Sequence, residues 1–570
     1  MKKIKSDGFA FSALAAALCL VVFGACFTPE LEDIPEEENG ITTGSTPFDA
    51  PPRLTLSKSG DEKTVTASWS ASEPKPDVYD IYYIKENASN AETVRTGTRV
   101  ANVKSGAKII FTMPGTYSFI VRAIKSGYQS VNSAVKTTTL AFEVPPAQSK
   151  RGVSYNFTDQ AGGASSAGAV MDLLESVTWF YNWGTQPDGD VAAAAAARDV
   201  AYFPMSWNAS GDVPNRIRAY KASHPECDFI LGYNEPNLTD QANMTPSQAA
   251  AQWPTLVDLA NELDMKLVSP AMNYGTLSGY SDPIKWLDEF FAKPGVSLED
   301  VSAIAIHCYM PYPGAVKGFI DKFKKYGKPI WMTEFCGWEQ SGYAVIHNAE
   351  DQMRYMSEVV TYMDLDPAVE RYAWFIPLYG NNGTEFPYMQ LLTKTNPPQL
   401  TDLGKAYAKM GCCDKTVYTP AGQKIEAERF SDCNVSEWVS LDWSSNDTYN
   451  GGDQYHFYQG SVHFRPTTDS ADDTGGLDIY EFNNSKTSQW VEYQVQTPEA
   501  KAYTLSLRYQ ASSAASLKIA VDGGSELTQA LNASSWATQQ VSLGSLAAGQ
   551  HKLRLKIASG SLALNWLKVE

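Results

Sequence analysis

Eight short apolar runs between Arg151 and Cys413 constrain the fold of this 570-residue chain more than any other feature. Each run is continuous rather than alternating, which is typical of a parallel strand buried on both faces. Helix-like stretches separate the runs, so the segment repeats a strand–helix unit, and about 250 residues are enough for a closed (β/α)8 TIM barrel over residues 150–413. A doubly wound open sheet is the alternative, but no Gly-rich phosphate loop stands where that fold would use one. The runs begin at Gly152, Val177, Ala201, Phe229, Lys266, Ala303, Pro329 and Tyr372.

Two all-β segments flank the predicted barrel. Residues 47–146 alternate in short β runs, with Trp69 early and a run headed by Tyr117 late, which resembles an immunoglobulin-like or fibronectin type III sandwich. We expect it to be a spacer, with carbohydrate binding as the alternative. Residues 423–570 return to short strands separated by Gly, Ser, Asn and Asp, which predicts a second β-sandwich of the jelly-roll or Greek-key kind. The predicted fold class is therefore multidomain.

The first 25 residues have the layout of an export signal. Three lysines precede an apolar core, Phe9 to Phe23, that is too short to favour a spanning helix. The core ends in Phe23-Gly24-Ala25-Cys26, which resembles a bacterial lipoprotein signal and implies a lipid on Cys26. Residues 26–46 form an acidic, flexible tether that resembles the export tag of Bacteroidetes surface lipoproteins. We therefore expect an exported monomer, lipid-anchored to the outer membrane and facing the cell exterior.

Composition narrows the choice of partners. The formal net charge is −18 and no basic stripe is present, so nucleic acid is not an expected partner. The 14 Trp and 30 Tyr fit large cores and β-sandwiches, and stacking on sugar rings is the functional alternative. The six cysteines after Cys26 lack metal-ligand spacing, and their pairing cannot be assigned from sequence.

Two glutamates follow directly on apolar runs, where a buried core has no use for a carboxylate. Glu235 ends the fourth run and Glu334 ends the seventh, and the carboxyl ends of barrel strands form the catalytic face. A helix N-cap or a surface ion pair would explain either residue alone. Two carboxyl groups about 5–5.5 Å apart cleave a glycosidic bond with retention of configuration. The pair therefore indicates a glycoside hydrolase.

The motifs around these glutamates resemble the clan A glycoside hydrolases and, within that clan, family 128. The resemblance covers nearly all of Arg151 to Gly411 and implies that Glu235 is the acid/base, Glu334 the nucleophile, and Asn234 a ligand of the sugar 2-hydroxyl. It also implies a β-1,3-glucanase that cuts β-glucan internally. Cys308 departs from the family, in which an aromatic residue is commoner there. The motifs are Tyr181-Asn182-Trp183, Gly232-Tyr233-Asn234-Glu235-Pro236-Asn237, Leu267-Val268-Ser269-Pro270-Ala271, Ile306-His307-Cys308-Tyr309 and Trp331-Met332-Thr333-Glu334-Phe335.

Two alternatives to this function stay open. One is a hydrolase of the same clan that acts on β-1,4-mannan or xylan. The other is a non-catalytic surface protein that binds glycans, although a binder has no reason to keep both glutamates.

Further side chains at strand ends are candidates for substrate binding. We expect His307 or Tyr309 to hydrogen-bond Glu334 and keep it ionised, Trp374 to floor the subsite of the cleaved sugar, and Trp183 and Trp207 to stack on other sugars. No cofactor is expected for catalysis, because the three barrel histidines have no ligand-like spacing.

The C-terminal segment resembles carbohydrate-binding module family 6, through Ile425-Glu426-Ala427-Glu428, Trp490-Val491-Glu492-Tyr493 and Asn565-Trp566. The resemblance implies a sugar clamped between Tyr480 and Trp536. Ala563 departs from it, because an Asn usually completes that site. Glu426 and Glu428 are candidates for a structural calcium site, with a solvated edge strand as the alternative.

Overall fold

A computed structural model describes residues 37–38, 41–59, 64–84, 87–100, 102–111, 115–140, 150–339, 346–379, 386–434, 462–472, 476–483 and 489–570. The chain divides into two compact units, of which one holds residues 22–146 and the other holds the barrel and the C-terminal sandwich. In the part of the chain described, no helix is long and apolar enough to cross a membrane. The expected export signal and Cys26 lie outside the described residues.

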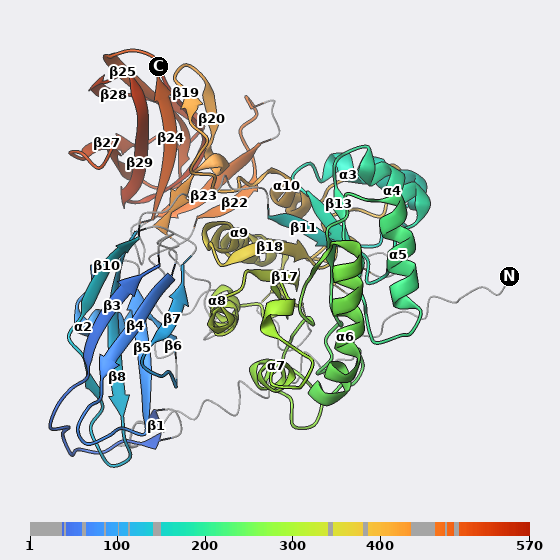
Figure 1. The fold of residues 1–570 in the computed structure, drawn as a ribbon. Coiled ribbons are helices and arrows are strands. Elements are labelled where there is room, and N and C mark those ends of the chain that lie inside the picture. The colour runs from blue at the N-terminus through green and yellow to red at the C-terminus, as the bar shows by residue number, and fades with distance from the viewer. Residues whose placement is uncertain are drawn as a thin grey trace. The chain divides into compact units, whose positions relative to one another are not determined.

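The N-terminal unit consists of two antiparallel sheets, drawn in blue in Figure 1. Trp69, Ile81 and Phe119 belong to the apolar cluster at its core. The expected tether is shorter than predicted, because Gly44 N donates to Tyr128 O at 3.0 Å and Thr46 pairs with Tyr128. One sheet contains β3 (Arg53–Lys58), β4 (Thr64–Ser70) and β7 (Ala107–Ile110); the other contains β5 (Val78–Ile84), β6 (Thr98–Val100), β8 (Gly115–Ile124), β9 (Val131–Asn132) and β10 (Lys136–Leu140). A short helix α2 (Asn90–Thr96) and a hairpin of β1 (Glu37–Glu38) and β2 (Ile41–Thr42) complete the unit.

Eight parallel strands of residues 150–374 pair in a ring. Six lie in the order β13-β12-β11-β18-β17-β16, and β14 pairs with β15. Parallel bridges Met205–Leu231 and Met272–Ile306 join these two sheets at both edges. The strands are β11 (Arg151–Ser154), β12 (Trp179–Tyr181), β13 (Ala201–Tyr202), β14 (Phe229–Ile230), β15 (Lys266–Leu267), β16 (Ile304–Cys308), β17 (Ile330–Phe335) and β18 (Val369–Trp374).

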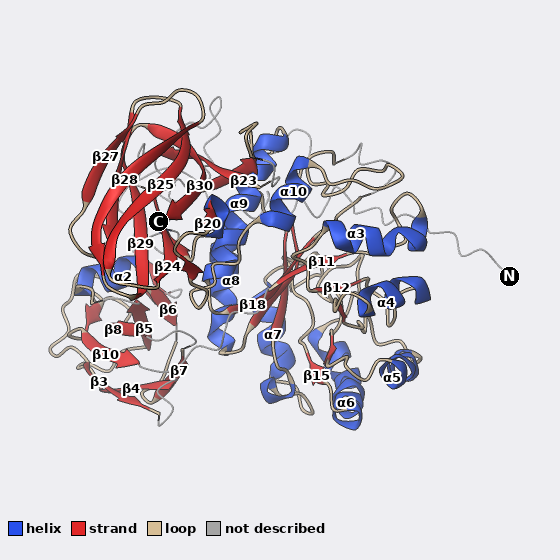
Figure 2. Ribbon diagram, turned by 90° about the horizontal axis from the view of Figure 1, so that it is seen from above, coloured by secondary structure: helices blue, strands red, loops and turns tan. Residues whose placement is uncertain are grey.

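A helix follows every strand of this ring, and the helices surround the strands in Figure 2. Connections of this kind between parallel strands bring all eight carboxyl ends to one face of the barrel. The helices are α3 (Ala167–Leu173), α4 (Gly189–Ala196), α5 (Val213–Ser223), α6 (Pro246–Leu263), α7 (Pro283–Phe291), α8 (Pro313–Phe323), α9 (Ala349–Leu365) and α10 (Asp402–Lys409).

Aromatic side chains fill the lower part of the barrel around one cation. The Arg371 guanidinium carbon lies 5.0–5.9 Å from the ring centres of Trp179, Phe203, Phe229 and Trp331. Two residues further along β12, the Tyr181 ring stacks over Trp179 at 6.4 Å, because alternate residues of a strand share a face. The aromatic layer around Arg371 therefore packs directly against Tyr181.

The C-terminal module is a sandwich of two mainly antiparallel sheets, with Leu505, Leu507, Leu555 and Leu564 fully buried. Its first strand precedes the predicted boundary at residue 423. One sheet contains β19 (Thr419–Pro420), β21 (Asp432–Cys433), β24 (Trp490–Thr497), β26 (Ala515–Val521), β27 (Leu527–Leu531) and β29 (Gly549–Ser559). The other contains β20 (Lys424–Glu426), β22 (His463–Pro466), β23 (Leu477–Asn483), β25 (Lys501–Ala511), β28 (Ala537–Leu546) and β30 (Ser561–Val569).

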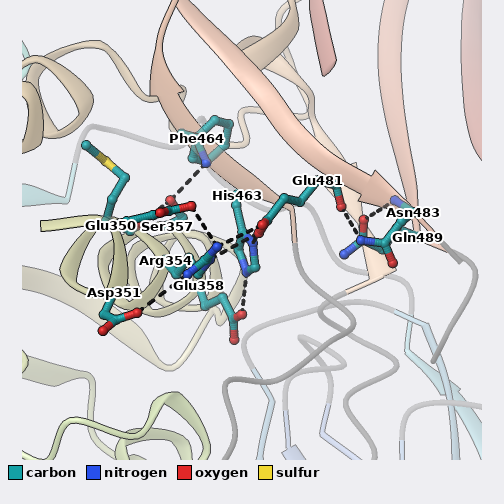
Figure 3. A network of polar contacts seen from close by, with 11 residues as sticks. Glu350, Asp351, Arg354, Ser357, Glu358, His463, Phe464, Glu481, Asn483 and Gln489 are labelled. Atoms are coloured by element: carbon teal, nitrogen blue, oxygen red, sulfur yellow. Dashed lines mark hydrogen bonds and ion pairs between the residues drawn. The ribbon is translucent and has the colours of Figure 1, made fainter. Parts of the chain in front are cut away.

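Charged side chains join this module to α9 (Figure 3). Arg354 pairs with Glu481 at 2.8 Å, and His463 lies between Glu358 at 2.7 Å and Glu481 at 3.0 Å. Phe464 N donates to Ser357 Oγ at 3.0 Å. These contacts explain why α9 is buried although it carries several charged residues.

Candidate active site

Glu235 and Glu334 both lie at the carboxyl ends of the strands. Glu334 belongs to β17, where it pairs with His307 across an irregularity in the register. Glu235 follows β14, and its amide donates to Ala271 O at 3.0 Å. Glu235 and Trp183 have positive φ values of 44° and 61°, a conformation that costs about 1–3 kcal/mol in residues other than glycine and concentrates at functional sites.

Glu334 is held by donors on both carboxylate oxygens. Oε1 accepts from Tyr181 OH and Trp183 Nε1, each at 2.7 Å, and Oε2 accepts from Tyr309 OH. Hydrogen bonds of this kind favour the ionised carboxylate. The arrangement suits a carboxylate that acts as a nucleophile.

Glu235 is held on one oxygen. Oε1 accepts from Asn273 Nδ2 at 3.0 Å and from His307 Nδ1 at 2.9 Å. Oε2 is buried and has no hydrogen-bond partner among the described residues. A carboxyl group with one occupied and one unoccupied oxygen can carry its proton on the unoccupied one, as a general acid must.

The two carboxyl groups and His307 are electrostatically coupled. Burial raises the pKa of Glu334, the charge of His307 opposes this and repulsion from Glu235 adds to it, so the net pKa lies above its ordinary value. Burial lowers the pKa of His307, but Glu334 and Glu235 outweigh it and the net pKa is raised. A protonated His307 therefore offsets part of the negative charge at this site.

Glu235, His307 and Glu334 place one ligand-type atom each within 4.8 Å of one another. The two carboxyl groups are therefore close neighbours, as the reaction of a retaining glycosidase requires, although the same donors could hold a divalent cation. A metal bound through His307 Nδ1 would replace the hydrogen bond between that atom and Glu235. The hydrogen bond that His307 Nδ1 makes with Glu235 is one that proton transfer between these groups can use.

Aromatic rings line one side of the carboxylate pair. The Phe375 ring centre lies 6.0 Å from Trp183, 5.2 Å from Tyr309 and 6.4 Å from Tyr379. Trp338 packs against Tyr309 at 5.4 Å. Flat aromatic faces beside the reacting groups are suited to stacking on sugar rings.

The structure places Trp374 away from this site, contrary to the prediction. Its side chain is fully buried, packs against Tyr355 of α9 and Tyr407 of α10, and donates to Met389 O at 2.9 Å. Successive strand residues face opposite sides. The ring of the next residue, Phe375, packs instead against Trp183 and Tyr309, which both contact Glu334.

Asn234 and Trp207 are neighbours at the same face. Asn234 N donates to Trp207 O at 2.9 Å, and Asn234 Nδ2 donates to Gln241 at 3.1 Å. Asn234 Oδ1 has no partner among the described residues and can accept from a sugar hydroxyl. Trp207 is half-buried, so one part of its ring remains available for stacking.

Sequence reasoning missed Tyr181 and Asn273 as site residues. Tyr181 stood in a quoted motif, but the hydrogen bond from its side chain to Glu334 across the barrel leaves no mark in the local sequence. Asn273 follows β15, and a polar residue shortly after a strand is the sequence feature that could have identified it.

In the C-terminal module, the expected aromatic clamp does not form. Tyr480 is buried and packs against His463 and the Arg465 guanidinium, at 5.9 and 5.2 Å between centres. Trp536 is half-buried and donates to Thr468 Oγ1 at 3.2 Å. The two aromatics therefore differ in exposure, and only Trp536 is open to a sugar.

The side chains of Glu426 and Glu428 offer the carboxylate oxygens that a hard cation prefers. Each has a buried Oε2 without a hydrogen-bond partner among the described residues. Burial raises the pKa of Glu428 to about 8, and the charge of Glu426 adds to it. Calcium prefers such carboxylate oxygens, although Lys424 Nζ already pairs with Glu426 at 3.1 Å.

Family models match two segments of the chain. Residues 152–407 match the glycosyl hydrolase catalytic core, and residues 458–569 match the carbohydrate binding module of family 35. The chain therefore combines a glycosyl hydrolase catalytic core with a family 35 type module, which corrects the expected family 6. The motifs behind that expectation are largely buried in the sandwich, so they reflect strand packing more than ligand type.

Solved structures similar to the barrel are GH128 β-1,3-glucanases. An endo-β-1,3-glucanase of subgroup II from Pseudomonas viridiflava is 36% identical, over 45% of this chain and 96% of that chain, with a TM-score of 0.39. A second, from Sorangium cellulosum, is 30% identical, over 45% and 97%, with a TM-score of 0.38.

A curated relative is the alkali-sensitive linkage protein 1 of Schizosaccharomyces pombe, 23% identical over 211 residues. These are 36% of this chain and 35% of that protein. The chain thus spans about a third of the length of this relative.

Proposed function

We propose that this chain is a retaining endo-β-1,3-glucanase of glycoside hydrolase family 128. The observation that carries the proposal is the unequal environment of two neighbouring carboxyl groups. Within the described part of the chain, donors contact both oxygens of Glu334 but only one oxygen of Glu235. The similarity to β-1,3-glucanases supports the choice of linkage.

In the first step, the Glu334 carboxylate attacks the anomeric carbon while Glu235 gives its proton to the departing glycosidic oxygen. The carbon–oxygen bond breaks and a covalent glycosyl-enzyme forms on Glu334. Tyr181, Trp183 and Tyr309 hold the nucleophile in place through their hydrogen bonds.

In the second step, Glu235 has become a carboxylate and removes a proton from water. The oxygen of that water attacks the anomeric carbon, which releases Glu334 and restores the original configuration. The protonated Glu235 is then ready for the next cycle.

Product analysis tests the linkage and the mode of cleavage. The purified protein is incubated with β-1,3-glucan, mixed-linkage glucan, β-1,4-mannan and xylan, and the products are separated by chromatography. We expect a ladder of oligosaccharides from β-1,3-glucan. Release of glucose alone would contradict internal cleavage. Cleavage of only mannan or xylan would show that the enzyme is a clan A hydrolase with a different substrate. No cleavage of any glycan would favour a non-catalytic binder.

We also propose that the module binds glycan through Trp536, that Glu426 and Glu428 hold a structural calcium ion, and that the protein is monomeric. Half-exposure of Trp536 supports the first of these, and the two unpartnered carboxylate oxygens support the second. Binding of wild type and Trp536→Ala to insoluble β-1,3-glucan tests the first, and equal binding would contradict it. Sedimentation of the purified protein tests the third.

We further propose that the chain is exported and anchored by a lipid on Cys26 to the outer membrane, facing the cell exterior. The signal-like first 25 residues support this location. In the native host, labelled palmitate should enter the wild type but not a Cys26→Ser variant. A wild type without label would contradict the anchor.

A further inference from the structure

Asn273 lies beside the acid/base candidate and follows β15 in the chain. Its Nδ2 donates to Glu235 Oε1 at 3.0 Å, and its side chain is 9% exposed. The preceding residue, Met272, bridges to β16, where His307 N donates to Met272 O at 2.9 Å. Asn273 is therefore fixed by the strands that also carry His307.

Hydrogen bonds determine which way the Asn273 amide points. Tyr274 N donates to Asn273 Oδ1 at 2.8 Å, and a backbone N–H can only donate, so the oxygen must face it. The NH2 group must then face Glu235. The backbone adds support, since Asn237 Nδ2 donates to Asn273 O at 2.7 Å.

Asn273 differs from His307, the other donor to Glu235 Oε1, in two respects. His307 Nδ1 lies 2.9 Å from Glu235 and 3.4 Å from Glu334, so it is shared between both carboxyl groups. Asn273 bonds only Glu235 of the two among the described contacts. An amide also donates at every pH, whereas an imidazole changes its protonation.

We propose that Asn273 is a positioning residue for acid/base catalysis, which holds Glu235 Oε1 so that the proton is carried and transferred by Oε2. The proposal rests on the role of Glu235 in the proposed function. Of the two carboxyl oxygens of Glu235, Oε2 is the one without a hydrogen-bond partner among the described residues, which leaves it open to the glycosidic oxygen. Because the amide remains a donor, Glu235 keeps one orientation as it alternates between acid and base.

The first test compares two substrates with Asn273→Ala. Loss of a hydrogen bond to a charged group lowers turnover of β-1,3-glucan about 10- to 100-fold. Turnover of a dinitrophenyl β-glycoside should change less than about threefold in its glycosylation step, because that leaving group scarcely needs a proton. Equal losses on both substrates would overturn the proposal.

A second variant, Asn273→Asp, keeps the shape of the side chain but removes its donor. The added negative charge beside Glu235 favours the protonated acid, so the upper limb of the pH–activity profile should move to higher pH. An unchanged profile would count against the positioning role. Melting curves of both variants separate this effect from unfolding.

A double-mutant cycle separates this proposal from the proposed function. If Asn273 acts through Glu235, then Glu235→Gln/Asn273→Ala should lose no more activity on β-1,3-glucan than Glu235→Gln alone. Losses that multiply would show that Asn273 acts independently, with the function intact. A Glu235→Gln enzyme with near wild-type activity would instead refute the proposed function itself.

Discussion

Replacing His463 with glutamine should remove a pH-dependent part of the stability of the barrel–module junction. His463 is buried between Glu358 on α9 and Glu481 on β23 (Figure 3), with Arg354 also paired to Glu481. Burial lowers the pKa of His463, but hydrogen bonds from its ring to the two carboxylates outweigh it and raise the pKa to about 8. The charged imidazole therefore stabilises the junction.

The size of the effect follows from the shift in pKa. Between the ordinary value of about 6.5 and about 8, the difference corresponds to about 2 kcal/mol. Because the pKa is raised in the folded state, this stability is complete below about pH 6.5 and is lost as the pH rises through about 8. Burial raises the pKa of Glu481, but its hydrogen bonds with His463 and Arg354 outweigh burial and lower the pKa to about 2. Glu481 therefore stays charged throughout this range.

Thermal melting of the full chain between pH 6 and pH 9 measures this effect. The wild type should lose about 2 kcal/mol more over this range than His463→Gln. His347→Gln is the matched control, because its side chain is 50% exposed and lies before the same helix; it should follow the wild type. Parallel curves for wild type and His463→Gln would refute the reasoning.

Three further predictions concern the two glycan-related domains. Tyr309→Phe removes a donor from Glu334, so kcat should fall about 10- to 100-fold. The acidic limb of its pH–rate profile should move to higher pH, because the lost hydrogen bond lowers the pKa of Glu334. An acidic limb at the wild-type position would contradict this. Phe375→Ala should raise KM for β-1,3-glucan, whereas Trp374→Ala should mainly lower the melting temperature. The opposite pattern would show that Trp374, and not Phe375, contacts the substrate. Chelation by EDTA should lower the melting temperature of the wild type but not that of Glu426→Gln/Glu428→Gln, and it should leave the rate of hydrolysis of soluble oligosaccharides unchanged. A fall in that rate would instead indicate a metal bound by Glu235, His307 and Glu334.

The sequence was sufficient for the strands and the two carboxylates because each leaves a local mark. The eight strands of the ring coincide with or lie beside the eight apolar runs, and Glu235 and Glu334 stand out as charges directly after such runs. The partner of each side chain is set by contacts across the barrel. Tyr181 and Glu334 are 153 residues apart in sequence, yet 2.7 Å apart in space.

Side-chain direction near strand ends was the harder problem. The register between β17 and β18 shifts between Met332 and Phe335, so the facing of Glu334 on β17 does not by itself give the facing of Trp374 on the neighbouring strand. Tyr480 illustrates a different limit, since it pairs with His463, which contacts α9. Packing between domains has no local sequence signature.

The configuration of rescued products tests the central claim, that Glu235 is the acid/base and Glu334 the nucleophile, most directly. Glu235→Ala and Glu334→Ala enzymes are each supplied with an activated aryl β-glycoside and azide, and the anomeric configuration of the glycosyl azide is determined by NMR. Azide should attack the glycosyl-enzyme of Glu235→Ala and give the β-azide, whereas in Glu334→Ala it fills the place of the nucleophile and gives the α-azide. The same configuration from both variants would contradict the assignment of the two glutamates.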